Sequence, residues 1–278
     1  RGRGAVMLRL LSLLGAIATA GATRILSRPA VAPLAASGRE GALGLVRALE
    51  FKHRLRVCNA YPLAAPLDIL RGEHERLTEK EGPMRFETCR DFSASLQVGD
   101  KLEFKIGDTT TGTFAVSDLP SSDAVLLLVV HRHDQLSTAV SFESHVFSDM
   151  ESSQVAVIDT YRGSAKGKPV ITDTPPAAVK GHSPTAARRE ELRYSSVVAV
   201  SPGQYQVELD GPDGSRNASK PLVALPHESY VLLRTGIEAE SGQSYPEDLV
   251  VFPMSEAKVV HSGAAAAQEA SAIALLVA

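Results

Sequence analysis

The feature that most constrains this chain is an internal repeat. Residues 55–61 (LRVCNAY) resemble residues 155–161 (VAVIDTY), which lie 100 positions later. Residues 118–127 resemble residues 224–233 at an offset of 106, and both segments contain Leu-Pro before an apolar run. Two further pairs of motifs keep the same order at offsets of 104 and 105: residues 94–100 with 198–204, and 146–147 with 251–252. Several motifs at a nearly constant offset indicate a duplicated structural unit.

Each copy of the repeat has the pattern of β-strands. Apolar residues alternate with polar ones in short runs, for example Leu102, Phe104 and Ile106, and turn residues separate the runs. Residues 125–130 are continuously apolar, which is typical of a strand buried on both faces. No helical period is long enough to supply crossover helices. We therefore expect an all-β fold of two tandem antiparallel, immunoglobulin-like β-sandwich domains that arose by internal duplication.

The repeat also sets the expected domain organisation. The first β-sandwich domain should span residues 53–149 and the second residues 152–253. Residues 23–52 form a leader or linker before them, and residues 254–278 an Ala-rich tail after them. The join between the domains is short, so we expect the domains to contact each other.

Residues 1–22 have the pattern of a signal peptide. A basic start without acids leads into an apolar stretch and then into small residues suited to cleavage, and Met7 is a candidate start. The stretch is shorter than the roughly 20 apolar residues that span a bilayer. A buried amphipathic helix is the alternative. We expect export to a secreted, periplasmic or organelle-lumen location. Residues 30–33 (AVAP) loosely resemble a plastid-leader motif, so a plastid reached through a two-part leader is the alternative location.

Export would permit two covalent modifications. Cys58 and Cys89, the two cysteines of the chain, lie 31 positions apart and could form a disulfide. In the chain-entropy description such a loop stabilises the fold by roughly 3–4 kcal/mol. Two reduced, buried thiols are the alternative. Asn217 begins an Asn-Ala-Ser sequon and is a candidate glycosylation site if the chain passes through an endoplasmic reticulum.

Charge and aromatic content argue against nucleic-acid binding. The chain has 29 Lys and Arg against 32 Asp and Glu, which gives a formal net charge of −3. Only 5% of its residues are aromatic and none is Trp. Nucleic-acid binding relies on a basic surface and on aromatic stacking, so we expect no nucleic-acid partner. We expect membrane association only through a partner.

The sequence carries no strong catalytic motif. It has neither a Gly-x-Ser-x-Gly elbow nor a Gly-rich phosphate loop before a Lys-Ser/Thr pair. Its one histidine cluster contains His131, His133 and Asp134, with His145 as another possible ligand. Histidines two apart on a strand share a face and could bind a metal, but a solvated strand end is the simpler interpretation. We therefore expect no enzyme, no catalytic residues, no cofactor and no metal.

The longest excursions from the strand pattern occur at the same place in both copies. Residues 71–91 are highly charged, and residues 162–189 are rich in Pro, Gly and Ala and carry several Lys and Arg. Long loops on a rigid sandwich often hold binding residues, and solvated mobile loops are the alternative. The excursions predict a protein or glycan partner.

The strand and turn motifs resemble those of a known family. They are residues 57–60 (VCNA), 67–69 (LDI), 198–205 (VAVSPGQY), 221–225 (PLVAL) and 230–233 (YVLL). The pattern, over about residues 55–253, resembles the periplasmic alginate O-acetylation adaptor family (AlgF) and, more distantly, bacterial surface repeats of unknown function. The resemblance implies two tandem β-sandwiches after a signal peptide, acting as a non-catalytic partner of acetyltransferases.

These observations lead to one functional hypothesis and two alternatives. We expect a non-catalytic exported binding or adaptor protein that presents long loops to a protein or glycan, in polysaccharide modification. A structural subunit of a membrane-associated or lumenal complex is the alternative. A metal-dependent hydrolase that uses His131 and His133 is less favoured.

Overall fold

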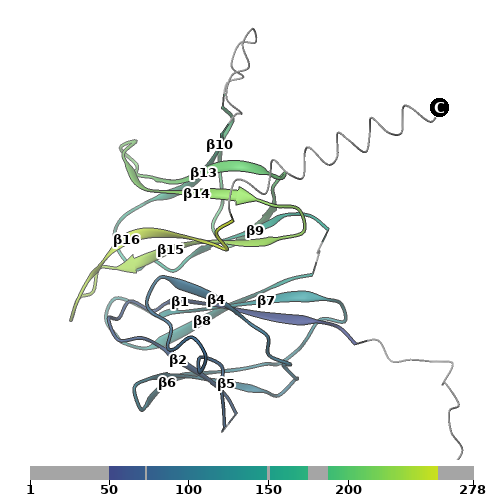
Figure 1. The fold of residues 1–278 in the computed structure, drawn as a ribbon. Coiled ribbons are helices and arrows are strands. Elements are labelled where there is room, and N and C mark those ends of the chain that lie inside the picture. The colour runs from purple at the N-terminus through teal and green to yellow at the C-terminus, as the bar shows by residue number, and fades with distance from the viewer. Residues whose placement is uncertain (1–49, 73, 149–150, 175–186, 256–278) are drawn as a thin grey trace, which may run out of the picture. The chain divides into compact units, whose positions relative to one another are not determined.

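Strands make up all the regular structure of the described residues, and they contain no helix (Figure 1). The computed structural model describes residues 50–72, 74–148, 151–174 and 187–255. The predicted signal segment, nearly all of the leader, residues 175–186 and nearly all of the Ala-rich tail lie outside these ranges. Within them, no helix is long and apolar enough to cross a membrane.

The first half of the described chain forms two four-stranded sheets. The inner sheet has the order β4-β1-β7-β8 and the outer sheet β3-β2-β5-β6. The strands are β1 (His53–Ala60), β2 (Asp68–Arg71), β3 (Glu75–Arg76), β4 (Thr88–Phe92), β5 (Lys101–Ile106), β6 (Thr109–Ala115), β7 (Ala124–Arg132) and β8 (Val140–Phe147). A core that includes Val57, Phe104 and Leu128 fills the space between the sheets.

The second half repeats this arrangement strand for strand. Its inner sheet has the order β12-β9-β15-β16 and its outer sheet β11-β10-β13-β14. The strands are β9 (Gln154–Asp159), β10 (Lys168–Asp173), β11 (Arg189–Glu191), β12 (Ser196–Ala199), β13 (Gly203–Asp210), β14 (Arg216–Ala224), β15 (Ser229–Ile237) and β16 (Tyr245–Phe252). Adding eight to each strand number of the first half reproduces both sheet orders, which confirms two tandem sandwiches from a duplication.

The repeat also extends to the turn that follows the first strand. Asn59 Oδ1 accepts a hydrogen bond of 3.0 Å from the main-chain N–H of Tyr61. Asp159 Oδ1 accepts a bond of the same length from the N–H of Tyr161. The similar motifs at residues 55–61 and 155–161 therefore encode the same side-chain-to-backbone turn.

One strand pair in each sandwich differs from the expected antiparallel arrangement. β1 runs parallel to β7, with Leu55 beside Leu126, and β9 runs parallel to β15, with Val155 beside Tyr230. All other strand pairs in the described chain are antiparallel. Alternation along a strand records which face is buried and not the direction of the neighbouring strand, so the sequence pattern could not reveal these pairs.

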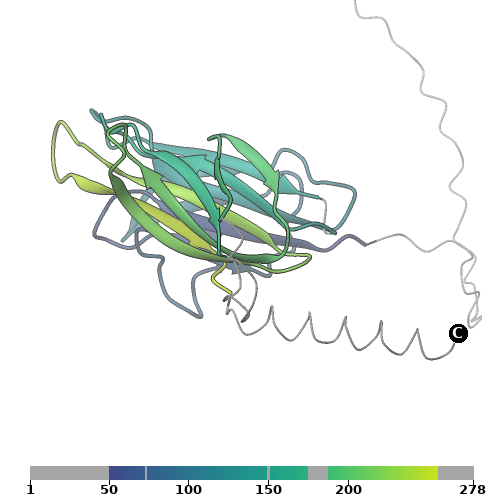
Figure 2. The ribbon, with the colours of Figure 1, turned by 90° about the horizontal axis from the view of Figure 1, so that it is seen from above.

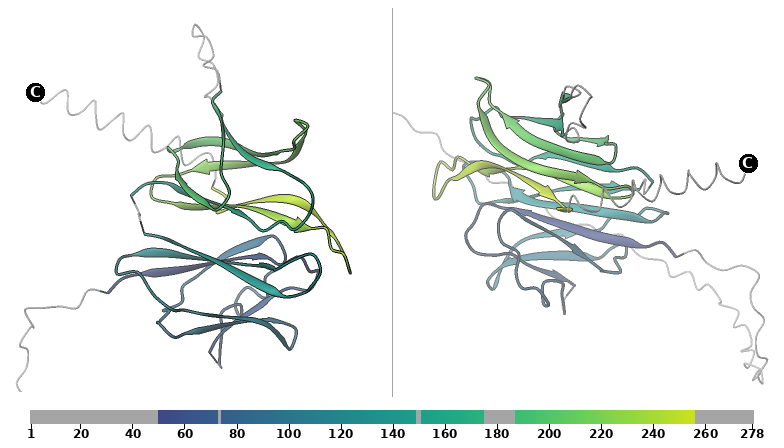
Figure 3. Two further views of the ribbon diagram at one scale, coloured as in Figure 1. Left: turned by 180° about the vertical axis from the view of Figure 1, so that it is seen from behind. Right: turned by 45° about the horizontal axis from the view of Figure 1, so that its top comes forward.

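The two inner sheets pack face to face, so the four sheets form four layers (Figures 1 and 3). Seen from above, the strands of the layers run in similar directions (Figure 2). A third core lies between the sandwiches and includes Leu127, Phe147, Ile158 and Leu233. Every residue of β7 and of β15 is buried, because each strand lies between two cores. This confirms the prediction that residues 125–130 are buried on both faces.

The two excursions contain more structure than the expected long loops. Residues 71–91 include β3 and the start of β4, and Met84 is fully buried and exchanges two main-chain hydrogen bonds of 2.8 Å with Leu67. Residues 162–189 include β10. These strands were missed because β3 has two charged residues and no apolar one, and β10 contains a proline.

Candidate functional site

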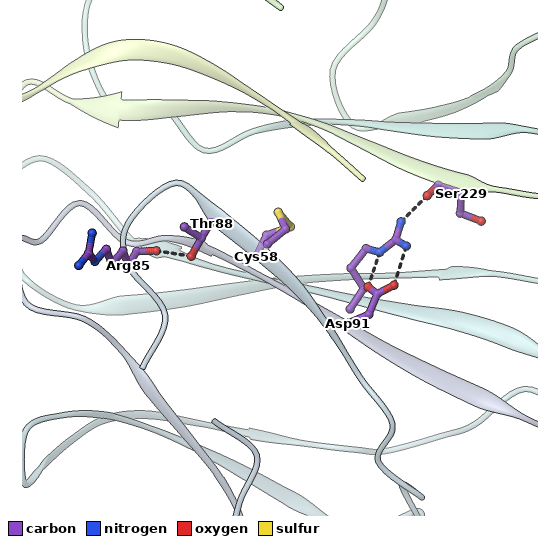
Figure 4. Close-up of a disulfide and its surroundings, with 7 residues drawn as sticks. Cys58, Arg85, Thr88, Asp91 and Ser229 are labelled. Carbon is purple, nitrogen blue, oxygen red and sulfur yellow. Dashed lines mark hydrogen bonds and ion pairs between the residues drawn. A yellow bond between two sulfur atoms is a disulfide. The ribbon is translucent and has the colours of Figure 1, made fainter. Parts of the chain in front are cut away.

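A buried arginine connects the two sandwiches. The side chain of Arg56, on β1, is fully buried and forms hydrogen bonds of 2.7 and 2.9 Å to the two carboxylate oxygens of Asp91 (Figure 4). The same guanidinium lies 3.3 Å from Glu228 and donates a hydrogen bond to the main-chain carbonyl of Ser229, both in the second sandwich. It also lies 4.9 Å from the ring centre of Phe252. Arg56 therefore fixes the first sandwich to the second.

Two side-chain contacts continue this junction between the sandwiches. Thr235 Oγ1 donates a hydrogen bond of 2.8 Å to Glu87 Oε1. Phe86 meets Tyr245 edge to face, with ring centres 5.2 Å apart. Burial raises the pKa of Glu87, although its hydrogen bond from Thr235 opposes the shift. The junction therefore combines an apolar core with polar contacts, as expected of surfaces that stay together.

A second buried arginine organises the second sandwich internally. Arg234 Nη1 lies 3.0 Å from Asp159, and Arg234 Nε donates a 2.6 Å hydrogen bond to Glu247. Its guanidinium also lies 4.5 Å from the ring centre of Tyr161. Burial, with a hydrogen bond from the Tyr161 hydroxyl to Glu238, raises the pKa of Tyr161 to about 12. These paired groups have a structural role.

His131 of the predicted metal cluster is buried in β7. Its Nδ1 lies 2.9 Å from the carbonyl of Arg132 and 3.5 Å from Arg162 Nη2, and its Nε2 lies 3.9 Å from Glu143. Burial lowers the pKa of His131, and the positive charge of Arg162 lowers it further. A guanidinium this close to a ring nitrogen also repels a metal cation.

His133 and Asp134 have partners of their own. His133 follows the end of β7 and is exposed, with Nδ1 2.8 Å from Ser141 Oγ. Asp134 Oδ1 accepts hydrogen bonds from the N–H groups of Leu136 (2.9 Å) and Ser137 (2.6 Å), and these bonds lower the pKa of Asp134. Among the described residues, no three His, Cys, Asp or Glu side chains come together as metal ligands.

The predicted disulfide between Cys58 and Cys89 is present (Figure 4). The two cysteines are direct cross-strand partners on β1 and β4, within one sheet. Cys58 is fully buried in the core between the sandwiches. The pairing confirms the disulfide prediction and locks the edge strand β4 to β1.

The candidate glycosylation site lies on β14. Asn217 is exposed, and its Nδ2 donates a hydrogen bond of 2.9 Å to Glu247. Its Oδ1 accepts one of 3.0 Å from Ser215. Exposure leaves the amide accessible to attachment of a glycan.

Among the described residues, the strand β12 has no neighbouring strand on one side, and we call this side its free edge. It is the terminal strand of its sheet and pairs with β9, with Val198 opposite Val155. The N–H of Val200 donates to the carbonyl of Ser153 at 2.9 Å, so Val198, two residues earlier, also bonds toward β9. The backbone groups of Val197 and Ala199 therefore point away from β9. Both residues are exposed, Val197 by 38%.

A hollow flanks this strand on each face. The first, about 450 Å³, opens between the sheets of the second sandwich, and Val198 lines it together with Ile171, Leu192 and Tyr205. The second, about 480 Å³, lies between the sandwiches. Its lining includes Ala156, Ile158, Val197, Glu143 and His145. We call β12 with these two hollows the edge site.

The corresponding edge of the first sandwich is charged. β4 carries Arg90 and Asp91 at its centre. Arg90 pairs with Glu81 at 2.9 Å, and Asp91 lies 3.3 Å from Arg54 as well as beside Arg56. Charged residues on an edge strand prevent pairing with other strands. β12, with the sequence SVVA, has no such charge. Sequence reasoning missed the edge site because nothing local marks a strand as terminal in its sheet.

No family model matches this chain, and no curated protein sequence matches it either. The resemblance of residues 55–253 to the alginate O-acetylation adaptor family therefore stays a prediction.

Proposed function

We propose that this protein is an exported, non-catalytic binding or adaptor protein. The observation that carries the proposal is the edge site: an uncharged free strand edge between two hollows, held on a platform of four packed sheets. Recognition elements are commonly presented by rigid scaffolds of this kind.

The junction between the sandwiches supports this proposal. The shared core and the Arg56 contacts hold the two copies together, so one binding surface can draw on both. The second hollow illustrates this, because Glu143 comes from the first sandwich and Val197 from the second. A duplicated fold with such a composite surface suits a protein that holds a partner in place.

The disulfide is consistent with an oxidising compartment. Export through residues 1–22 as a signal peptide belongs to the proposal. For the partner we propose a protein of polysaccharide modification, such as an acetyltransferase, which the family resemblance implies. A glycan partner and a structural role in a membrane-associated or lumenal complex remain the alternatives to be separated by experiment.

A hydrolase that uses His131 receives no support from the side-chain geometry. The imidazole is buried, and its Nδ1 lies 2.9 Å from the carbonyl of Arg132 and 3.5 Å from Arg162. His133 is exposed and contacts Ser141.

Affinity purification of the chain from its own cells under mild conditions, with mass spectrometry, tests the proposal. We expect a specific partner to be recovered in near-equal amount. A large membrane complex in its place would favour the structural-subunit alternative. Recovery of the chain alone, with stoichiometric zinc or hydrolytic turnover that His133→Ala abolishes, would contradict the proposal.

A further inference from the structure

We propose that β12 accepts an extended segment of the partner as an additional strand, and that this segment carries alternating apolar residues and a Lys or Arg. The inference rests on the proposed binding function and specifies where and how the partner binds. It is carried by the free backbone edge, the two hollows and the charge beside them.

The first step concerns the backbone. Val197 and Ala199 each direct one N–H and one C=O away from β9. No main-chain hydrogen bond to these groups occurs within the described residues. An extended peptide beside β12 would pair with them and continue the sheet, which is the strand-addition mode of peptide recognition.

The second step concerns side chains. Successive side chains of a strand point to opposite faces. A strand added to β12 would therefore direct one side chain toward the hollow of about 450 Å³ and the next toward the hollow of about 480 Å³. Val197 and Ile158 line the second hollow, which favours apolar side chains. Val198 and Leu192 give the first hollow apolar contacts too, although charged residues such as Glu190 and Arg193 also line it.

The third step concerns charge. Glu143 lines the second hollow, and its side chain is 40% exposed. His131 lies 3.9 Å from Glu143 and favours its own neutral form. Burial raises the pKa of Glu143, and the positive charge of Arg162 opposes this shift. The first hollow is lined by charges of both signs, including Glu190, Arg188 and Arg193, and therefore does not favour a cation. A Lys or Arg of the added strand that is directed toward the second hollow would place a positive charge beside Glu143.

The fourth step is the contrast between the two copies. β4 is protected by Arg90 and Asp91, whereas β12 exposes Val197 on an uncharged edge. Uncharged edges promote aggregation unless another strand or element covers them. Of these two equivalent strands, β12 alone has an uncharged edge. We expect such an edge on a strand that docks a partner.

Selection of random linear peptides against the purified full chain tests the proposal, with two matched variants. Val197→Pro removes an N–H that points away from β9, so it disables strand addition and leaves the β9–β12 ladder intact. Val197→Thr has a similar shape and keeps the N–H. We expect the selected peptides to alternate apolar residues and to include a basic residue. Val197→Pro should weaken their binding about tenfold, the worth of one hydrogen bond, and Val197→Thr by less than about threefold.

Two further measurements locate the bound peptide. Glu143→Gln should weaken basic peptides by about fivefold and leave neutral analogues unchanged. Bound peptide should slow hydrogen exchange of the Val197 and Ala199 amides. Slowed exchange at other strands only would overturn the proposal.

Four outcomes would also overturn it. The first two are that no peptide is enriched, or that selected peptides bind Val197→Pro as well as the parent. The third is a dimer of the parent that Val197→Pro dissociates, which would make a second copy the occupant. The fourth is stronger peptide binding after truncation at Ser255, which would make residues 256–278 the occupant.

If the natural partner still co-purifies with Val197→Pro, the strand-addition proposal fails and the binding function stands. If nothing co-purifies with the parent, the binding function itself fails.

Discussion

Arg56 on β1 donates a hydrogen bond to the main-chain carbonyl of Ser229 on β15, so a side chain of the first sandwich is fixed to the backbone of the second. The same guanidinium pairs with Asp91 of its own sandwich and with Glu228 of the other. A buried charge that loses its partners is costly, so the two copies are expected to unfold together.

Replacement of Arg56 tests this coupling. Breaking a fully buried ion pair costs about 3–5 kcal/mol. Asp91 and Glu228 are each 25% exposed, so water partly compensates them when the arginine is removed. We therefore expect Arg56→Ala to lower the free energy of unfolding by about 2–3 kcal/mol. Arg56→Lys keeps the charge but loses the bidentate pairing and should have an intermediate effect. Denaturant unfolding measures both. A loss below about 0.5 kcal/mol for Arg56→Ala would contradict the role assigned to this residue.

Reduction of the disulfide should also destabilise the fold. Cys58 and Cys89 close a loop with a separation of 31 residues, so reductant should lower the free energy of unfolding by roughly 3–4 kcal/mol. Chemical denaturation with and without reductant gives this difference. The double variant Cys58→Ala/Cys89→Ala is the control, and its stability should not respond to reductant. Equal stability of the oxidised and reduced parent would disprove the prediction.

Stability should depend on pH through His131. Burial lowers the pKa of His131 in the folded chain below the ordinary histidine value of 6.5, so the unfolded chain binds this proton more readily. The free energy of unfolding therefore falls as the pH falls through 6.5, by at most about 1.4 kcal/mol per pH unit for this one group. The fall ends once the pH is below the pKa of His131 in the folded chain. His131→Gln should flatten the fall between pH 7 and 5. Glu87 and Glu143, whose pKa values burial raises, act in the opposite direction and are common to both proteins. An unchanged slope would show that His131 does not titrate in this way.

Asn217 should carry a glycan when the chain is made in a eukaryotic secretory host. Its exposed position on β14 leaves the sequon accessible. Intact-mass analysis should show one glycan that Asn217→Gln and Ser219→Ala both remove. Gln206, which donates a hydrogen bond to Ser219 but is not part of the sequon, provides the control variant Gln206→Ala. Glycan-free protein from that host would refute the prediction.

Much of the architecture could be predicted because the duplication leaves a direct record in the sequence. The apolar run at residues 125–130 indicated a strand buried on both faces, and β7 is such a strand. The similar segments 55–61 and 155–161 indicated equivalent strands and turns, which β1 and β9 provide. The two cysteines indicated a disulfide, and they form one.

The candidate site was harder to predict because it depends on contacts between distant segments. Arg56 is one charged residue in an apolar strand, and its contact with Ser229 spans 173 positions. Val197 belongs to the edge site because β12 is the terminal strand of its sheet. No local sequence pattern shows that a strand is terminal. The histidines were grouped by sequence spacing, but His131 lies inside β7 and His133 beyond its end.

Cross-linking in intact cells, followed by capture of the chain and mass spectrometry, tests the central claim most directly, because it detects binding before the cells are broken. A binding protein should yield one dominant partner, with cross-links from Lys168, which pairs with Glu191 in the lining of the first hollow. Capture of the chain without any reproducible partner, together with catalytic turnover by the purified protein, would contradict the claim.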